Sequence, residues 1–154
     1  MFKKLLPILS LCVLLIGCST KSLVIPTLDE KPSYNKHTVN ELKNGVNLYF
    51  VEKSTQLESK YIIYLETLAK VLERNPHYIV EIEGHTDSRG SVAANKRVST
   101  NRANAVRNQL LIDYQVNPEQ IKAIGVGSDK PIDSNATEEG RAYNRRASAI
   151  LKIQ

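Results

Sequence analysis

From residue 45 onward, the apolar positions alternate between the period of a strand and the period of a helix. Residues 46–51 (VNLYFV) are β-prone and partly alternating, which predicts a strand. Leucines and a tyrosine recur at helical spacing over 57–75, which predicts an amphipathic helix that Pro76 ends. Residues 78–83 (YIVEIE) predict a second strand that ends at Gly84.

The second half of the chain repeats this alternation. Ser91 is a suitable cap for a long helix, and residues 121–126 predict a third strand. Thr137 caps a short helix that runs to residue 143, and 147–153 alternates as a last strand. The order β-α-β-α-β-α-β predicts an α+β fold, with helices packed on one face of a small mixed sheet. The expected apolar side of the long helix consists of Val98, Ala103, Val106, Leu110 and Tyr114.

The N-terminus has the pattern of an export signal. Lys3 and Lys4 precede an apolar run over 5–16, which is shorter than the ~20 residues that a membrane-spanning helix needs. Residues 15–18 (LIGC) resemble the lipobox of bacterial lipoproteins, which implies that Cys18 is acylated and becomes the mature N-terminus. Ser19, where an Asp signals retention in the inner membrane, implies sorting to the outer membrane. The alternative is a plain signal peptide that contains two cysteines.

Residues 19–44 contain Pro, Ser, Thr, Asn and Lys without sustained periodicity, so we expect a tether. Such a tether reaches ~85 Å when extended and ~30 Å as a flexible coil. The alternative is that 23–25 packs on the domain as an extra strand. The predicted organisation is a signal peptide at 1–17, a lipidated N-terminus and tether at 18–44, and one domain at 45–154.

Composition and charge narrow the possible functions only slightly. Apolar residues make up 42% of the chain and charged residues 24%, which is ordinary for a globular protein. The net charge is +5, and Lys3 and Lys4 supply two of these charges, so the remainder carries +3. This positive charge is suited to an acidic polymer, but it does not indicate which polymer. Because Cys12 and Cys18 both precede the domain, neither a disulfide framework nor a cysteine metal site supports it. No metal or cofactor is predicted.

The polar residues suggest a binding site between the second strand and the long helix. Residues 84–90 (GHTDSRG) form a loop at a helix N-terminus, which favours an anion. Asn95, Ser99 and Arg102 follow at i, i+4 and i+7 and so share one helix face. Asp87 and Arg102 on either side of one cleft match a zwitterion, with Asp87 facing its ammonium and Arg102 its carboxylate.

Each of these residues also has a purely structural interpretation. His85 is either a metal ligand or a structural residue of the turn, and no second His or Cys lies at ligand spacing. For Asp87 the structural alternative to ligand binding is to cap the helix. For Arg102 it is a surface ion pair with a carboxylate. Arg145 and Arg146 are adjacent on an expected strand and point to opposite faces, so at most one serves the pocket.

Three separated motifs occur together in this chain. They are GHTDxxG at 84–90, NxxxSxxRAxxV at 95–106 and GRxxNRR at 140–146. Together they resemble the OmpA C-terminal-like domain family, which includes the peptidoglycan-associated lipoproteins. The resemblance covers about residues 46–153 and includes the GVG sequence at 125–127. Val98 departs from the family, which usually has Leu there.

The resemblance implies a ligand, a site and a location. The family's ligand is the meso-diaminopimelate of the peptidoglycan stem peptide, and its binding Asp and Arg fall on Asp87 and Arg102. Arg145 matches an Arg that adds to the carboxylate side. The resemblance therefore implies an outer-membrane lipoprotein that faces the periplasm and binds peptidoglycan non-covalently, without being an enzyme. Positions that shape the pocket or hydrogen-bond within it fall on Thr86, Ser88, Asn95 and Ser99.

Three other functions compete with peptidoglycan binding. A wall-modifying enzyme would use His85, Asp87 and Glu83, but no Ser or Cys nucleophile pairs with a base and no zinc set is complete. Nucleic-acid binding has weak support in the net positive charge and the seven tyrosines. Against it, an exported chain rarely meets nucleic acid. A structural part of a larger envelope machine, such as the Tol system, a motor or a secretion complex, stays compatible with wall binding. A co-purified protein partner distinguishes it.

Overall fold

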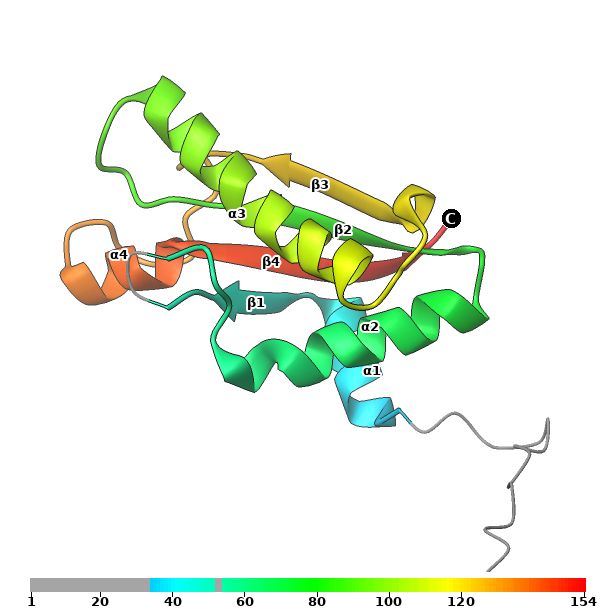
Figure 1. The fold of residues 1–154 in the computed structure, drawn as a ribbon. Coiled ribbons are helices and arrows are strands. Elements are labelled where there is room, and N and C mark those ends of the chain that lie inside the picture. Colours follow the sequence, from blue (N-terminus) through cyan, green and yellow to red (C-terminus); the bar gives the residue numbers. More distant parts are fainter. Residues whose placement is uncertain (1–33, 52–53) are drawn as a thin grey trace, which may run out of the picture. The chain divides into compact units, whose positions relative to one another are not determined.

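Four strands form one mixed sheet in the order β1-β4-β2-β3 (Figure 1). The computed structural model describes residues 34–51 and 54–154, so the expected signal peptide, Cys18 and the possible strand at 23–25 lie outside the described residues. Strand β4 pairs antiparallel with both β1 and β2, whereas β2 and β3 are parallel. The predicted small mixed sheet is therefore confirmed. The strands are β1 (Val46–Tyr49), β2 (Tyr78–Gly84), β3 (Ile121–Gly125) and β4 (Arg146–Ile153).

Helices α2 (Ile62–Arg74) and α3 (Val92–Ile112) cover one face of this sheet (Figure 1). A 3₁₀ turn, η1 (Ser59–Tyr61), leads into α2, and η2 (Pro118–Gln120) precedes β3. Helix α3 connects the parallel pair β2 and β3, which cannot be joined by a tight turn. The core between the layers is apolar and includes Leu48, Leu65, Leu68, Val80, Ile82, Val106, Leu110 and Leu151.

The other face of the sheet carries ion pairs. Lys130 donates to both carboxylate oxygens of Glu83, at 2.7 and 2.8 Å, and Lys152 pairs with Glu81. The strands therefore alternate between an apolar face under the helices and a polar face opposite, as period-2 patterning requires. Within the described residues, no helix combines the length and the apolar character needed to cross a membrane.

A helix absent from the sequence prediction is α1 (Lys36–Asn44), which lies inside the stretch expected to be a tether. The Asn35 side chain caps it by accepting the His37 N–H at 2.9 Å, and Leu42 is fully buried in the core. The Tyr64 hydroxyl of α2 donates to Glu41 at 3.2 Å. The folded part therefore begins before residue 45. Only two residues of this nine-residue helix are buried, and packing rather than periodicity stabilises so short a helix.

Two glycines bring α3 unusually close to the sheet. Gly84 and Gly125 are partners in the β2–β3 pairing. A Cβ on Gly84 would lie 1.8 Å from the Ser99 carbonyl oxygen, and one on Gly125 would lie 2.2 Å from the Thr100 nitrogen. This close approach allows the Ser99 hydroxyl to accept the Gly127 N–H at 2.9 Å. The helix is thereby fixed against the loops that follow both strands.

The apolar side predicted for α3 is partly wrong. Val98 is 38% exposed and faces a cleft, and Tyr114 lies beyond the last helical residue, Ile112. The buried side of the first half of α3 is instead polar, because Asn95 and Ser99 serve the adjacent loop. An apolar pattern cannot reveal such a face.

Candidate ligand-binding cleft

An open cleft of about 1350 Å³ lies between the end of β1, helix α3 and helix α4 (Glu138–Asn144). One part of its wall is charged and another part is aromatic. The charged lining residues include Arg89, Arg102, Glu138 and Arg145, and the aromatic ones are Tyr49, Phe50, Tyr61 and Tyr143.

The loop after β2 is held by main-chain hydrogen bonds. The His85 N–H donates to the Arg146 carbonyl at 2.9 Å, and the Thr86 N–H donates to the Gly127 carbonyl at 2.8 Å. The Asn95 side-chain amide reaches the Asp87 carbonyl at 3.4 Å. These contacts fix Asp87 in a buried position, 6% exposed, where it is hydrogen-bonded to Arg89 and Arg145, which line the charged end of the cleft.

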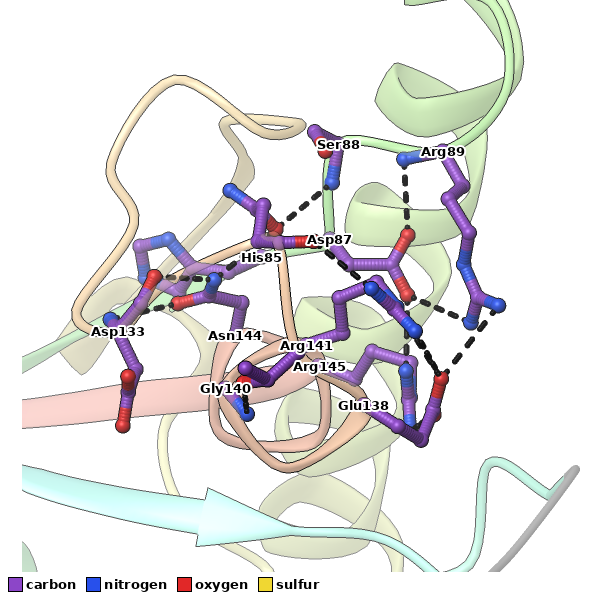
Figure 2. Close-up of polar contacts among 12 residues, drawn as sticks. His85, Asp87, Ser88, Arg89, Asp133, Glu138, Gly140, Arg141, Asn144 and Arg145 are labelled. Atoms are coloured by element: carbon purple, nitrogen blue, oxygen red, sulfur yellow. Dashed lines mark hydrogen bonds and ion pairs between the residues drawn. The ribbon is translucent and has the colours of Figure 1, made fainter.

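The Asp87 carboxylate accepts three hydrogen bonds (Figure 2). Its Oδ1 accepts the Arg89 backbone N–H at 2.9 Å. Its Oδ2 accepts the Arg145 guanidinium at 2.9 Å and the Arg89 guanidinium at 3.2 Å. Burial alone raises the pKa of Asp87, but the hydrogen bonds from Arg145 and Arg89 outweigh it and hold the pKa below its usual value. Asp87 is therefore ionised and already paired.

Glu138 is a second carboxylate in the same network. Its Oε1 accepts Arg145 at 2.9 Å, and its Oε2 accepts Arg141 at 2.8 Å. Arg89 lies 3.6 Å from the same Oε2, beyond hydrogen-bond distance. Burial alone lowers the pKa of Arg145, but its hydrogen bonds to Asp87 and Glu138 reverse this and raise it. Arg145 is therefore held between two carboxylates.

Arg102 approaches the charged end from α3. It donates to the His85 carbonyl at 2.7 Å, and its guanidinium carbon lies 5.9 Å from the centroid of the Phe50 ring. Burial and the nearby charge of Arg145 lower the pKa of Arg102, whereas Asp87 partly offsets them. In the described part of the chain this half-buried cation thus contacts a carbonyl and a ring face, and a carboxylate is its natural further partner.

Asn144 ties a second loop to the Asp87 loop (Figure 2). Its side-chain oxygen accepts the N–H groups of Ile132 and Asp133 at 2.8 and 3.1 Å. Its amide donates to the Asp133 carbonyl at 2.9 Å and to the Asn135 side-chain oxygen at 3.1 Å. That same oxygen of Asn135 accepts the Ser88 N–H at 3.1 Å. The buried Asn144 therefore helps to position residues 87–88.

The residues predicted for the site divide into three groups. Asp87, Arg102 and Arg145 meet at the charged end, and the two arginines line the cleft. Asn95 and Ser99 lie buried beneath the loop and hold it. Thr86 is buried with a hydroxyl that lacks a partner among the described atoms, and exposed Ser88 acts through its backbone N–H. Contact of any of them with a ligand stays a prediction.

The structure decides between the interpretations of several residues. The Ser91 side chain, and not Asp87, caps α3 by accepting the Ala94 N–H at 3.2 Å. Arg146 is buried and donates to the Asn47 side chain and the Lys130 carbonyl, both at 3.2 Å, so only Arg145 faces the cleft.

His85 is a buried structural residue. Its Nε2 lies 3.3 Å from the Ser148 hydroxyl and 3.9 Å from Glu83, and the described residues include no group of three metal-binding side chains. Burial, with the nearby charge of Arg146, lowers the pKa of His85 to about 4. The imidazole is therefore neutral at pH 7.

Sequence reasoning missed the roles of Arg89, Glu138 and Asn144. Arg89 lies two residues after Asp87, the spacing of an Asx turn, which is a weak local signal. The aromatic wall has no local signal, because two of its rings, those of Tyr49 and Tyr143, come from distant segments and meet edge to face, with centroids 6.2 Å apart.

Comparison with known proteins agrees with this fold. The family model described as "OmpA family" matches residues 49–145. Outer membrane porin F of Pseudomonas aeruginosa is 42% identical over 103 residues, which are 67% of this chain but only 29% of the porin. This chain thus spans less than a third of that relative's length.

Two solved structures are also similar. The peptidoglycan-associated lipoprotein from Burkholderia pseudomallei is 31% identical, with a TM-score of 0.64 over 69% of this chain and 89% of that one. The C-terminal domain of Helicobacter pylori MotB is 26% identical, with a TM-score of 0.59 over 71% and 86% of the two chains. The family model alone covers well over half of this sequence, in a segment that includes β2, β3 and the residues that line the cleft. The chain therefore belongs to the OmpA family.

Proposed function

We propose that this protein binds peptidoglycan non-covalently and anchors the outer membrane, or an envelope complex, to the cell wall. The ligand group is the free zwitterionic end of meso-diaminopimelate in the stem peptide. The observation that carries the proposal is the buried Asp87 carboxylate beside the guanidiniums of Arg102 and Arg145, at one end of an open cleft.

The geometry suits a group that carries both charges on one carbon. The ammonium of such a group fits Asp87, and its carboxylate fits Arg102 and Arg145, which already lie within the electrostatic influence of Asp87. These are interactions of binding, and the proposal involves no covalent step. Similarity to a peptidoglycan-associated lipoprotein of known structure supports peptidoglycan as the polymer that is bound.

The test is sedimentation of residues 19–154 with purified sacculi of the diaminopimelate type. We expect the wild type to sediment with these sacculi and not with a lysine-type wall. Asp87→Ala and Arg102→Ala should each remain in the supernatant, because each removes one half of the zwitterion site. Circular dichroism checks that the variants are folded.

Matched controls are available at exposed positions away from the charged end. Asp113→Ala removes a carboxylate that follows the last residue of α3, ~30 Å along the helix from its N-terminus. Arg74→Ala removes an exposed guanidinium in the last turn of α2. Both controls should sediment like the wild type. Unchanged binding by Asp87→Ala and Arg102→Ala would refute the proposed site.

We also propose that Cys18 carries the lipid that holds the protein in the outer membrane, with the domain in the periplasm. The support is the lipobox-like LIGC sequence. Metabolic labelling with palmitate, followed by membrane fractionation, tests this in the full chain. Cys18→Ser should lose the label, and the matched Cys12→Ser should keep it. Label that persists in Cys18→Ser would exclude lipidation at this residue.

A second candidate function is a structural role in a larger envelope machine, acting mainly through protein partners. The similarity to the MotB domain favours it, since the TM-score of 0.59 extends over most of both chains. Cross-linking in cells followed by purification distinguishes the two. A stoichiometric protein partner that is retained by the Asp87→Ala variant supports this candidate.

A further inference from the structure

The carboxylate proposed to receive the ligand's ammonium is not free. A carboxylate offers about four acceptor positions. In Asp87 three of them are taken, by the Arg89 backbone N–H and by the guanidiniums of Arg89 and Arg145 (Figure 2). About one position remains, on Oδ1, and an incoming ammonium that bonds to Oδ2 has to compete with a guanidinium that the protein supplies itself.

The two guanidiniums are not held equally. The Arg145 side chain is 31% exposed and makes 2.9 Å hydrogen bonds to both Asp87 and Glu138. The Arg89 side chain is 60% exposed, and its hydrogen bond to Asp87 is longer, at 3.2 Å. Arg89 is thus the partner that a ligand displaces more easily, and Glu138, 3.6 Å away, is the carboxylate that can receive it.

The charge balance decides which ligands can make this exchange. Among the described residues, the network of Asp87 and Glu138 contains three guanidiniums, those of Arg89, Arg141 and Arg145. It therefore carries excess positive charge even before the nearby Arg102 is counted. A lone ammonium adds another positive charge and is repelled. An ammonium with a carboxylate on the same carbon adds no net charge, and that carboxylate pairs with a guanidinium.

We propose that Arg89, supported by Glu138, is a specificity-determining residue, which opens Asp87 to an ammonium with an adjacent carboxylate and closes it to a simple amine. This inference rests on the proposed function. It assigns to Arg89 the rejection of lysine-type stem peptides, whose terminal ammonium has no neighbouring carboxylate. Asp87 and Arg102 then supply attraction, and Arg89 supplies discrimination.

The experiment measures dissociation constants by calorimetry for two soluble tripeptides. One is L-Ala-γ-D-Glu-meso-diaminopimelate, and the other has L-Lys as its third residue. The proteins are the wild type, Arg89→Gln and Arg74→Gln, each as residues 19–154. Arg74→Gln removes the same charge from an exposed position on α2 that does not line the cleft.

We expect Arg89→Gln to bind the lysine tripeptide more tightly than the wild type does. The ratio of the two dissociation constants should fall by about five-fold, the upper range of one partly exposed charge interaction. Arg74→Gln should leave the ratio unchanged. Glu138→Gln removes the carboxylate that receives Arg89, so it should weaken binding of the diaminopimelate tripeptide.

The outcomes separate this inference from the proposed function. If the wild type binds neither tripeptide, the proposed function fails and this inference fails with it. If the wild type binds the diaminopimelate tripeptide but Arg89→Gln shows no gain for the lysine tripeptide, only the inference is overturned. An equal gain in Arg74→Gln also overturns it, because the effect is then one of overall charge.

Discussion

At the scale of single residues, His85 is an imidazole kept neutral by its surroundings. It lies one residue after β2, is almost fully buried and contacts Ser148 through Nε2. Burial lowers its pKa to about 4, whereas an exposed His titrates near 6.5. Between pH 4 and pH 6.5, His85 therefore binds a proton in the unfolded chain but not in the folded protein.

The sign of the pH effect follows from this difference. Because the folded pKa is the lower one, the native state is not penalised above pH 6.5, and it loses stability as the pH falls from 6.5 toward 4. The loss reaches about 3 kcal/mol at 1.36 kcal/mol per pKa unit. Urea denaturation at pH 7, 5.5 and 4 should show this loss in the wild type.

The His85→Gln variant is the control, because it places a neutral amide near the Nε2 position. Its free energy of unfolding should fall less between pH 7 and pH 4 than that of the wild type. Equal pH dependence in the two proteins would mean that His85 is not the titrating group. The test compares the change in the free energy of unfolding between the two proteins, because the carboxylates titrate in both and their contribution cancels.

Individual site residues differ in how far the sequence could predict them. Asp87 and Arg102 could be paired in advance, because a loop and a helix face separated by a fixed spacing bring them together. The partners of Asp87 could not be predicted. Arg145 reaches it from 58 residues away, a contact that only the tertiary fold creates.

At the scale of secondary structure elements, the contact between α3 and the glycine pair sets the position of the site loops. Gly84 does not need a left-handed backbone, so its lack of a side chain serves close packing alone. Gly84→Ala would place a methyl group 1.8 Å from the Ser99 carbonyl oxygen and push the helix away. We expect a loss of about 3 kcal/mol or more in the free energy of unfolding.

Chemical denaturation of Gly84→Ala measures this loss, and sacculus binding should weaken with it, because the Ser99–Gly127 hydrogen bond stretches. Wild-type stability in Gly84→Ala would show that α3 can shift freely. In that case the glycine pair does not fix the helix.

Helix α4 organises its neighbouring loop mainly through one buried side chain. Asn144 is fully buried and makes four hydrogen bonds to residues 132–135. Asn144→Ala removes the partner of the Ile132 and Asp133 N–H groups and of the Asp133 carbonyl, so the free energy of unfolding should fall by about 2 kcal/mol. The loss is read from urea denaturation, with Asn108→Ala, an exposed position on α3, as a control expected within about 0.5 kcal/mol of the wild type.

Elements with a clear period could be predicted, and α1 could not. Strand β2 and helix α2 each bury a regular set of apolar residues, which period-2 and period-3.6 patterns reveal. Helix α1 buries only Thr38 and Leu42 in a polar sequence. Its existence depends on a surface formed by α2 and β4, which no local pattern contains.

At the scale of the whole molecule, the folded unit begins before β1. A protein of residues 34–154 should be more stable than one of residues 46–154, because the shorter one lacks Leu42 and exposes the core that it covers. The single substitution Leu42→Ala should cost about 2–5 kcal/mol. Lys43→Ala, exposed on the same helix, should be close to neutral, and thermal unfolding measures both.

Equal stability of the proteins of residues 34–154 and 46–154 would place α1 outside the unit that folds cooperatively.

The overall architecture could be predicted because the element order permits few arrangements of a small sheet with helices on one face. The strand order β1-β4-β2-β3 could not be obtained from periodicity, since pairing partners are chosen by the sheet as a whole.

The central place of β4 has a consequence for how the chain folds. Strand β4, the last strand in the described part of the chain, separates β1 from β2, and its pairing with β1 joins Val46 to Ala149, about a hundred positions apart. No fragment that ends before β4 can complete this sheet, so the sheet forms only after β4 has been made. Loop closure over such long separations is slow. We therefore expect a newly made chain to stay unfolded for a time, which is the state that the proposed export through a translocation channel requires.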